Sequence, residues 1–201
     1  MAKAQTELMS ILTILKRGLR SPQSIRHKGK RLSEILEAHA QFIRGNSSGT
    51  RADLSGADLA RAELAGSNLT LANLQGAKLE RANLREAKLS SADFSNANLR
   101  KADLRKADCT ETRFDGADLA EAQLGGAELF RANLHNANLR RAVCGATNFR
   151  DANVQGARFE GADMKTAILR ETNLDGVDLS RVDLSTALLP KGYKPSDSGR
   201  N

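Results

Sequence analysis

Between residues 52 and 59 the chain reads A-D-L-S-G-A-D-L, and this five-residue phrase is repeated twenty-eight times up to residue 191. It returns as A-N-L-R-E-A-K-L at 82–89 and as A-N-L-H-N-A-N-L at 132–139, and no insertion or deletion interrupts the series. The third position of the phrase is always large and apolar, with twenty Leu, four Phe, two Cys, one Val and one Met. The first position is always small, and it is Ala in twenty-two repeats.

A period of five excludes the two common regular structures. A long strand alternates with period 2 and an amphipathic helix has period 3.6, so neither keeps the small and large positions on one side. In a short extended segment, residues two apart point to the same side. The phrase therefore predicts short extended faces, with the first and third residues inside and the last two residues turning a corner.

A second period of twenty residues is visible at the corners. Positions 56, 76, 96, 116, 136, 156 and 176 all hold Gly or Asn, the residues that best tolerate a left-handed backbone. Four phrases per coil is the simplest interpretation, because solenoids stack one such unit on the next. The other three rows of corners hold bulky residues such as Glu86, Lys106, Arg131 and Arg141, so the sequence predicts turns without positive φ there.

These phrases resemble the pentapeptide repeat proteins, and the resemblance covers 140 of the 201 residues. It implies a right-handed quadrilateral β-helix. The predicted fold is thus an all-β solenoid of seven coils, built from 28 pentapeptides and preceded by two N-terminal α-helices. At about 4.8 Å per coil the solenoid is about 34 Å long. The motif is specific for this fold and says little about function.

Three regions follow from the composition. Residues 1–50 form a helical segment and cap with a basic linker, residues 51–191 form the β-helix, and residues 192–201 form a disordered tail. Apolar spacing predicts helices near 5–18 and 30–44, joined by a mobile basic link over 16–31. The second helix resembles the short N-terminal cap of some bacterial pentapeptide proteins, and it would cover the open end of the first coil.

The net charge of +7 is concentrated at the ends of the chain. Residues 51–189 contain 19 Lys and Arg against 20 Asp and Glu, whereas residues 1–50 contain 9 against 3. One basic row nevertheless recurs on the solenoid at twenty-residue steps, interrupted by Glu121 and Gly161. The candidate partner surface therefore comprises this row and the basic N-terminal segment: Arg61, Arg81, Lys101, Arg141 and Arg181, with Lys16, Arg17, Arg20, Arg26, Lys28, Lys30 and Arg31.

The sequence indicates no enzyme and no cofactor. Its three His residues are scattered, and no Cys or His pair has metal-ligand spacing. Cys109 and Cys144 fall on interior positions, which predicts packing without a disulfide. Phe94 and Phe114, twenty residues apart, are expected to stack in the core. The absence of a long apolar run in the first twenty residues predicts a cytoplasmic protein.

The second position of the phrase is Asp or Asn in eighteen repeats. The G-G-x-G-x-D nonapeptide of calcium-binding β-rolls is absent, so calcium binding is not indicated. Short polar side chains at this position are instead expected to bind nearby backbone groups.

Three functional hypotheses remain open from the sequence. The first is a non-enzymatic module that binds a protein partner, with the N-terminal helix as a candidate for self-association. The second comes from the resemblance, because some family members act as DNA mimics that occupy gyrase and protect it from quinolones. The third is association with nucleic acid or an anionic membrane through the basic N-terminal segment. A small-molecule substrate is not expected under any of them.

Overall fold

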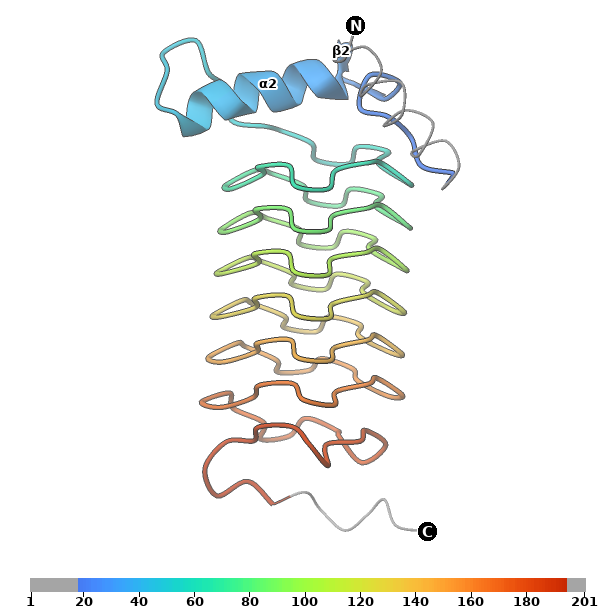
Figure 1. Cartoon of the computed structure of the whole chain (residues 1–201), viewed down its shortest axis with the longest axis vertical. Coiled ribbons are helices and arrows are strands. Elements are labelled where there is room, and N and C mark those ends of the chain that lie inside the picture. The colour runs from blue at the N-terminus through green and yellow to red at the C-terminus, as the bar shows by residue number, and fades with distance from the viewer. Residues whose placement is uncertain (1–17, 195–201) are drawn as a thin grey trace, which may run out of the picture.

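Parallel pairing between residues twenty positions apart builds the body of the protein (Figure 1). The computed structural model describes residues 18–194. In it the pairing begins at Asp53 with Asn73 and ends at Ile168 with Leu188. Each pairing step spans four pentapeptides, which confirms the predicted period of twenty and the β-helix solenoid.

The small and large positions of every phrase face the interior, as predicted. Leu54, Leu59 and Ala62 are typical, with at most 1 % of their surface exposed. Backbone hydrogen bonds join successive coils on both sides of each interior residue: Leu54 N donates to Asn73 O (2.7 Å), and Asn73 N donates to Ala52 O (2.9 Å). The column is thus filled with side chains and tied by a ladder of backbone bonds, which satisfies the polar groups that burial would otherwise leave unpaired.

The interior aromatic and sulfur residues lie where the register predicts. The Phe94 and Phe114 rings stack with their centroids 5.3 Å apart. Cys109 and Cys144 are free, fully buried thiols. Three threonines replace Ala at the small position, and each hydroxyl donates to a main-chain carbonyl, as from Thr112 Oγ1 to Leu89 O (2.7 Å).

The prediction for the corners is wrong. Every corner from residue 56 to residue 176 has a positive φ, including Glu86 (57°), Lys106 (59°), Arg131 (55°) and Arg141 (56°). Each turn is closed by a bond from the residue after the corner to the residue three positions earlier, such as Ala62 N to Leu59 O (2.9 Å), and a positive φ at the third residue is typical of type II turns. From Gly56 to Ala146 the corner N–H groups bond a carbonyl of the next coil, which offsets the cost of the left-handed conformation there.

The positive corner φ makes a stability prediction at Leu71. This residue has φ 64° and an exposed apolar side chain. Replacing Leu71 by glycine should raise the free energy of unfolding by up to about 1 kcal/mol, because the left-handed conformation costs a side chain about 1–2 kcal/mol and part of that gain is lost to the freer unfolded chain. Urea denaturation would measure it. The matched change Gly76→Ala, with φ 62° and no atom near the added carbon, should lower it by a similar amount.

The polar second position behaves as predicted. Its side-chain oxygen accepts a hydrogen bond from the backbone N–H two residues later, as in Ser55 N to Asp53 Oδ1 (3.2 Å) and Ala60 N to Asp58 Oδ1 (3.2 Å). Asn residues of this row also donate a hydrogen bond to the preceding coil, as in Asn73 Nδ2 to Asp53 Oδ1 (3.1 Å). These side chains stabilise the solenoid and leave the corners as its most exposed features.

A hairpin and a helix close the N-terminal end of the solenoid (Figure 1). Strand β1 (Arg26–His27) pairs antiparallel with β2 (Lys30–Arg31), and helix α2 (Leu32–Ile43) follows directly and lies across the first coil. The hairpin turn has positive φ at both central residues, Lys28 and Gly29, as expected for a tight two-residue turn. The predicted second helix is confirmed, with its start two residues later than predicted.

The prediction of a mobile link over 16–31 is wrong for its described part, residues 18–31. Arg20 pairs in parallel with Ala62, and its backbone bonds Arg61 O (2.6 Å) and Glu63 N (2.9 Å). Ile25 is buried in the core. This segment therefore occupies part of the edge that the first coil would otherwise expose. The predicted helix near 5–18 lies almost entirely outside the described residues.

His39 connects α2 to the first coil. Its side chain is fully buried, and its Nδ1 accepts a hydrogen bond from the Ala52 backbone N–H (3.0 Å). Burial lowers the pKa of His39, and the nearby charge of Arg51 acts in the same direction. The imidazole is therefore neutral in the folded protein, because a protonated Nδ1 could not accept this bond.

This environment predicts a pH dependence of stability. The unfolded chain binds a proton at His39 near pH 6.5 and the folded chain only at lower pH, so the free energy of unfolding should fall as the pH drops below about 6.5. His39→Leu should flatten the dependence between pH 7 and 5, measured by urea denaturation at each pH. Burial also lowers the pKa of His27, so His27→Gln is the control that separates the two. An unchanged slope in His39→Leu would contradict the assignment.

The other end of the solenoid is less regular. Within the described residues, no bridge joins Asn153 to residue 173 or Arg158 to residue 178. Leu174, Leu179 and Leu184 are 5–8 % exposed, whereas the corresponding leucines of the middle coils are fully buried. Residues 195–201 of the predicted tail lie outside the described part. No helix within residues 18–194 has the length and apolar character needed to span a bilayer.

Candidate interaction surface

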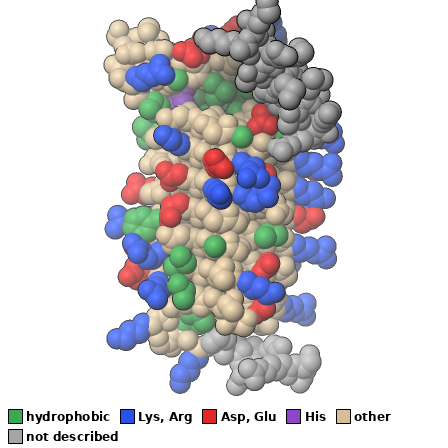
Figure 2. All heavy atoms as spheres, in the orientation of Figure 1, with side chains coloured by type: hydrophobic (Ala, Val, Ile, Leu, Met, Phe, Trp, Pro, Cys, Tyr) green, Lys and Arg blue, Asp and Glu red, His purple; other side chains and the backbone are tan. Residues whose placement is uncertain are grey.

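The predicted basic row stands along one edge of the solenoid. Arg61, Arg81, Lys101, Arg141 and Arg181 all occupy corner positions of the same face, one coil apart or a multiple of that spacing. Figure 2 shows basic side chains projecting from the edges of the stack with acidic side chains between them. The five basic residues therefore do form a row in space. The carboxylates around them determine which of their charges are already paired within the protein.

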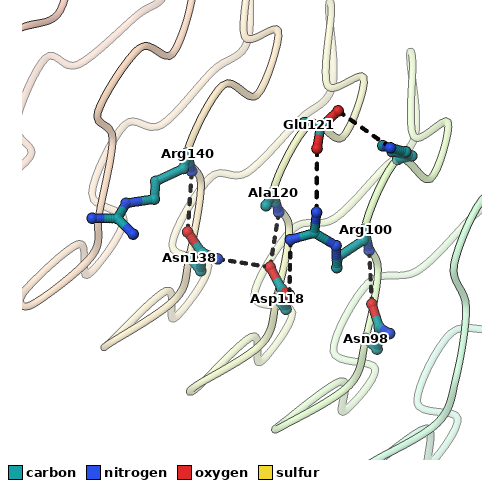
Figure 3. A network of polar contacts seen from close by, with 8 residues as sticks. Asn98, Arg100, Asp118, Ala120, Glu121, Asn138 and Arg140 are labelled. Atoms are coloured by element: carbon teal, nitrogen blue, oxygen red, sulfur yellow. Dashed lines mark hydrogen bonds and ion pairs between the residues drawn. The ribbon is translucent and has the colours of Figure 1, made fainter.

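The interruption at Glu121 neutralises the middle of the row. Its carboxylate lies 3.2 Å from Arg100 Nη2 and 3.5 Å from Lys101 Nζ. Arg100 is also 3.6 Å from Asp118, whose other oxygen accepts from Asn138 Nδ2 (2.9 Å). Figure 3 shows Arg100 directed toward these two carboxylates, while the Arg140 side chain extends away from them. The Arg100 and Lys101 charges are thus compensated within the protein.

Arg140 is held by a different carboxylate. Its Nε and Nη2 atoms donate to the two oxygens of Glu160 at 3.0 and 2.7 Å, a bidentate geometry. These hydrogen bonds lower the pKa of Glu160 from 4.5 to about 2, so the carboxylate is ionised throughout the physiological range. Glu160 also lies 3.9 Å from Arg158 Nε, so its charge is shared between these two arginines.

The second interruption, Gly161, leaves a hollow in the row. A concavity of about 610 Å³ lies here, lined by Arg140, Arg141, Glu160, Gly161 and Arg181 among others. Arg141 and Arg181 are exposed, and neither forms an ion pair with any residue between 18 and 194. Gly161 stands between them in the row, one coil from each. Two guanidinium groups that form no ion pair within residues 18–194 therefore border a site with no side chain at its centre.

The basic N-terminal residues are partly engaged with the first coil. Lys28 Nζ lies 2.5 Å from Asp53, and its hydrogen bond together with one from Ser55 holds the pKa of Asp53 well below its usual range. Arg20 lies 3.2 Å from Asp58. Arg26 Nη1 donates to Gly29 O (3.2 Å). In the hairpin all four predicted site residues are exposed, namely Arg26, Lys28, Lys30 and Arg31. Lys16 and Arg17 lie outside the described residues.

Known proteins identify the architecture. The family model described as pentapeptide repeats matches with eight copies, over residues 50–85, 67–105, 82–119, 107–143 and 147–185. The chain belongs to the pentapeptide repeat family. No curated protein matches it at significance.

Two solved pentapeptide repeat structures are similar to this one. HetL from the cyanobacterium Nostoc sp. strain PCC 7120, described as involved in heterocyst differentiation regulation, is 27% identical, with a TM-score of 0.50 over 71% of this chain and 86% of that one. QnrB1, a plasmid-mediated fluoroquinolone resistance protein, is 24% identical, with a TM-score of 0.51 over 70% of this chain and 78% of that one. The second likeness concerns the fold alone.

This pentapeptide repeat protein also carries a half-buried aromatic side chain that the sequence did not single out, Phe130. Two guanidinium groups lie over its ring, with Arg131 at 4.7 Å and Arg150 at 5.0 Å from the centroid. These arginines are further paired with Asp151 (3.8 Å) and Glu171 (3.3 Å). The apolar surface of Phe130 is therefore screened by its own neighbours.

The interior of this pentapeptide repeat protein offers no group for chemistry in the part that the structure describes. Burial raises the pKa of Cys109 and Cys144, so neither thiol is a nucleophile at neutral pH. Over residues 18–194 no group of three or more His, Cys, Asp or Glu side chains is placed to hold a metal ion. What the arrangement presents is a rigid, polar outer surface.

Proposed function

We propose that this protein is a non-enzymatic interaction module that binds a protein partner with the outer faces of its solenoid. One observation carries the proposal: the interior is filled by Ala, Leu and Phe side chains along its whole length, so binding can occur only on the outside. The polar residues there are held at regular intervals by backbone and side-chain hydrogen bonds, which gives a partner a pre-ordered surface.

The proposal takes the solenoid as a right-handed quadrilateral β-helix of seven coils over residues 51–191. Residues 1–50 form the cap with its basic linker, residues 192–201 a tail, and the protein acts in the cytoplasm. The hairpin and α2 close one end, so a partner has the four lengthwise faces available. Self-association through the N-terminal segment is a further part of this hypothesis.

Affinity purification tests the module. Full-length protein carrying a tag is expected to retain a protein partner in stoichiometric amount from a lysate of its source, after nuclease treatment. A chain with Leu119→Asp, which places a charge in the core and disrupts the solenoid, is the control that shows whether retention depends on the folded protein. A protein that is recovered alone at its natural concentration contradicts the proposal.

Two alternatives have weaker support. Gyrase binding by DNA mimicry needs an anionic rod, whereas residues 51–189 carry 19 basic and 20 acidic residues, a net charge of −1. A supercoiling assay that shows neither inhibition nor quinolone protection removes it. Polyanion or membrane contact through the N-terminal segment is weakened by the engagement of Arg20 and Lys28 with the first coil. Loss of vesicle or nucleic-acid binding on deletion of residues 1–17 would support that alternative.

A further inference from the structure

The basic row contains two versions of one local arrangement, with and without a carboxylate at the corner. In the first, Glu121 stands one coil after Lys101 and pairs with it at 3.5 Å. In the second, Gly161 stands one coil after Arg141, and no side chain fills the equivalent place. An ideal Cβ on Gly161 would lie 3.5 Å from Arg141 Cγ, so there is room for the missing group.

We propose that the hollow at Gly161 binds an acidic segment of a protein partner, whose carboxylates pair with Arg141 and Arg181. This inference rests on the proposed interaction function and names the surface and the chemistry of the partner. The two arginines are two coils apart, so their Cα atoms are about 10 Å apart at about 4.8 Å per coil. Two residues on the same side of an extended segment, with one residue between them, are about 7 Å apart, and the flexible Glu and Arg side chains can bridge the difference. Arginine is suited to this role because its planar fork pairs with a carboxylate bidentately.

The described residues that line the hollow do not form ion pairs with Arg141 or Arg181. Glu121 and Glu160 are the two carboxylates in the lining. Both oxygens of Glu160 accept from Arg140 at 3.0 and 2.7 Å, and Glu160 also lies 3.9 Å from Arg158. Within the described residues neither glutamate forms an ion pair with Arg141 or Arg181. An incoming carboxylate therefore meets two donors without first having to break an ion pair.

The same wall favours a peptide over a nucleic acid. Glu121 and Glu160 both line the hollow. A nucleic-acid strand brings a phosphate at every step and would place some of them against these carboxylates. A peptide can present two acidic side chains to Arg141 and Arg181 and neutral or donor groups to the glutamates. Discrimination thus comes from like-charge repulsion as well as from attraction.

A glycine-to-glutamate change tests the site with little risk to the fold. Gly161→Glu should recreate the arrangement at Glu121, with the new carboxylate paired to Arg141 of the preceding coil as Glu121 is paired to Lys101, and with its charge one coil from Arg181. Glutamate is tolerated at such corners, since Glu111, Glu121 and Glu171 have φ of 55°, 60° and 64°. Gly126→Glu is the matched control, because it adds the same charge at a corner with φ 68° on a different face.

The probe is a fluorescein-labelled ten-residue peptide of Gly and Ser that contains two Glu separated by one Ser. Its binding to the full-length protein is followed by fluorescence anisotropy at low salt. We expect Gly161→Glu and the double variant Arg141→Gln/Arg181→Gln to weaken binding at least tenfold, and Gly126→Glu to change it less than twofold. Circular dichroism verifies the fold of each variant. A wild-type protein that fails to bind this di-glutamate peptide at millimolar concentration, or equal binding by Gly161→Glu, overturns the proposal.

Labelled deca-thymidylate is the competing probe. Tighter binding of this oligonucleotide than of the di-glutamate peptide, lost in the same variants, would also overturn the peptide site in favour of nucleic acid. The affinity purification separates this inference from the broader function. A partner retained by Gly161→Glu as well as by the wild type would leave the interaction module standing and remove this surface, whereas no partner for either protein would contradict the module.

Discussion

Replacing Phe114 by alanine is expected to lower the free energy of unfolding by about 4 kcal/mol. The ring is fully buried and stacks on Phe94 with centroids 5.3 Å apart. Its removal exposes no new surface to water and leaves a void inside a narrow column, where the backbone ladder prevents the walls from closing in. The lost contacts therefore add to the lost hydrophobic burial, and the stack with Phe94 is lost as well.

Urea denaturation followed by circular dichroism at 218 nm would measure this loss. Phe114→Leu is the matched control, because leucine already occupies twenty of the twenty-eight large positions and should cost less than about 1.5 kcal/mol. A loss below about 1 kcal/mol in Phe114→Ala would mean that the column can collapse around the void, contrary to the rigid packing described above.

The second large effect is expected at Gly49, where the chain passes beneath the end of α2. An added Cβ would lie 2.0 Å from the backbone N of Phe42 and 2.4 Å from its Cα, so the backbone itself must move. Gly49→Ala should lower the free energy of unfolding by about 3 kcal/mol, at the upper end of the usual cost of overpacking. The displaced segment includes Thr50, whose N–H donates to Ala38 O (3.1 Å).

Hydrogen exchange locates this effect. In Gly49→Ala the amide of Ala52, which bonds His39 in the wild type, should exchange faster, while amides of the middle coils keep their protection. Gly45→Ala is the control: Gly45 has φ 77° but no atom within 4 Å of the added carbon, so only the backbone strain applies, about 1 kcal/mol. Equal losses in the two variants would refute the close approach at Gly49.

The solenoid was predictable because every repeat places a small residue and a large apolar residue at the same two positions. An unbroken series of large apolar residues at every fifth position leaves one way to bury them all, and the twenty-residue period of the Gly and Asn corners gave the length of a coil. The stacked Phe94 and Phe114 and the buried Cys109 and Cys144 follow from that register alone, so their places could be stated in advance.

The corner geometry was not predictable from residue preferences. Glu86, Lys106 and Arg131 are poor candidates for a positive φ, yet the corner N–H must point along the axis to reach the next coil. A hydrogen bond repeated at each coil outweighs the local preference. Asn and Gly occupy the one row of corners where the residue type itself lowers the energetic cost of a positive φ. They carry no information about the backbone conformation of the other three rows.

The N-terminal region and the hollow depend on contacts between distant residues, which a periodic pattern cannot encode. The basic composition of residues 16–31 indicated mobility, but the backbone of Arg20 completes the edge of the first coil at Ala62. From the sequence alone, Gly161 is only an interruption of the basic row. The structure shows that Glu160 pairs with Arg140 and Arg158, and that Arg141 and Arg181 form no ion pair within residues 18–194.

The irregular last coil gives the molecule a direction. In a stacked solenoid each coil is held in place only by the two coils next to it. One end is clamped by α2 and the hairpin, while the coil around Leu179 has lost two of its bridges. Under tension or heat the protein should therefore unfold from residue 188 toward residue 52, one coil after another. The first coil, which is covered by α2 and the hairpin, should unfold last.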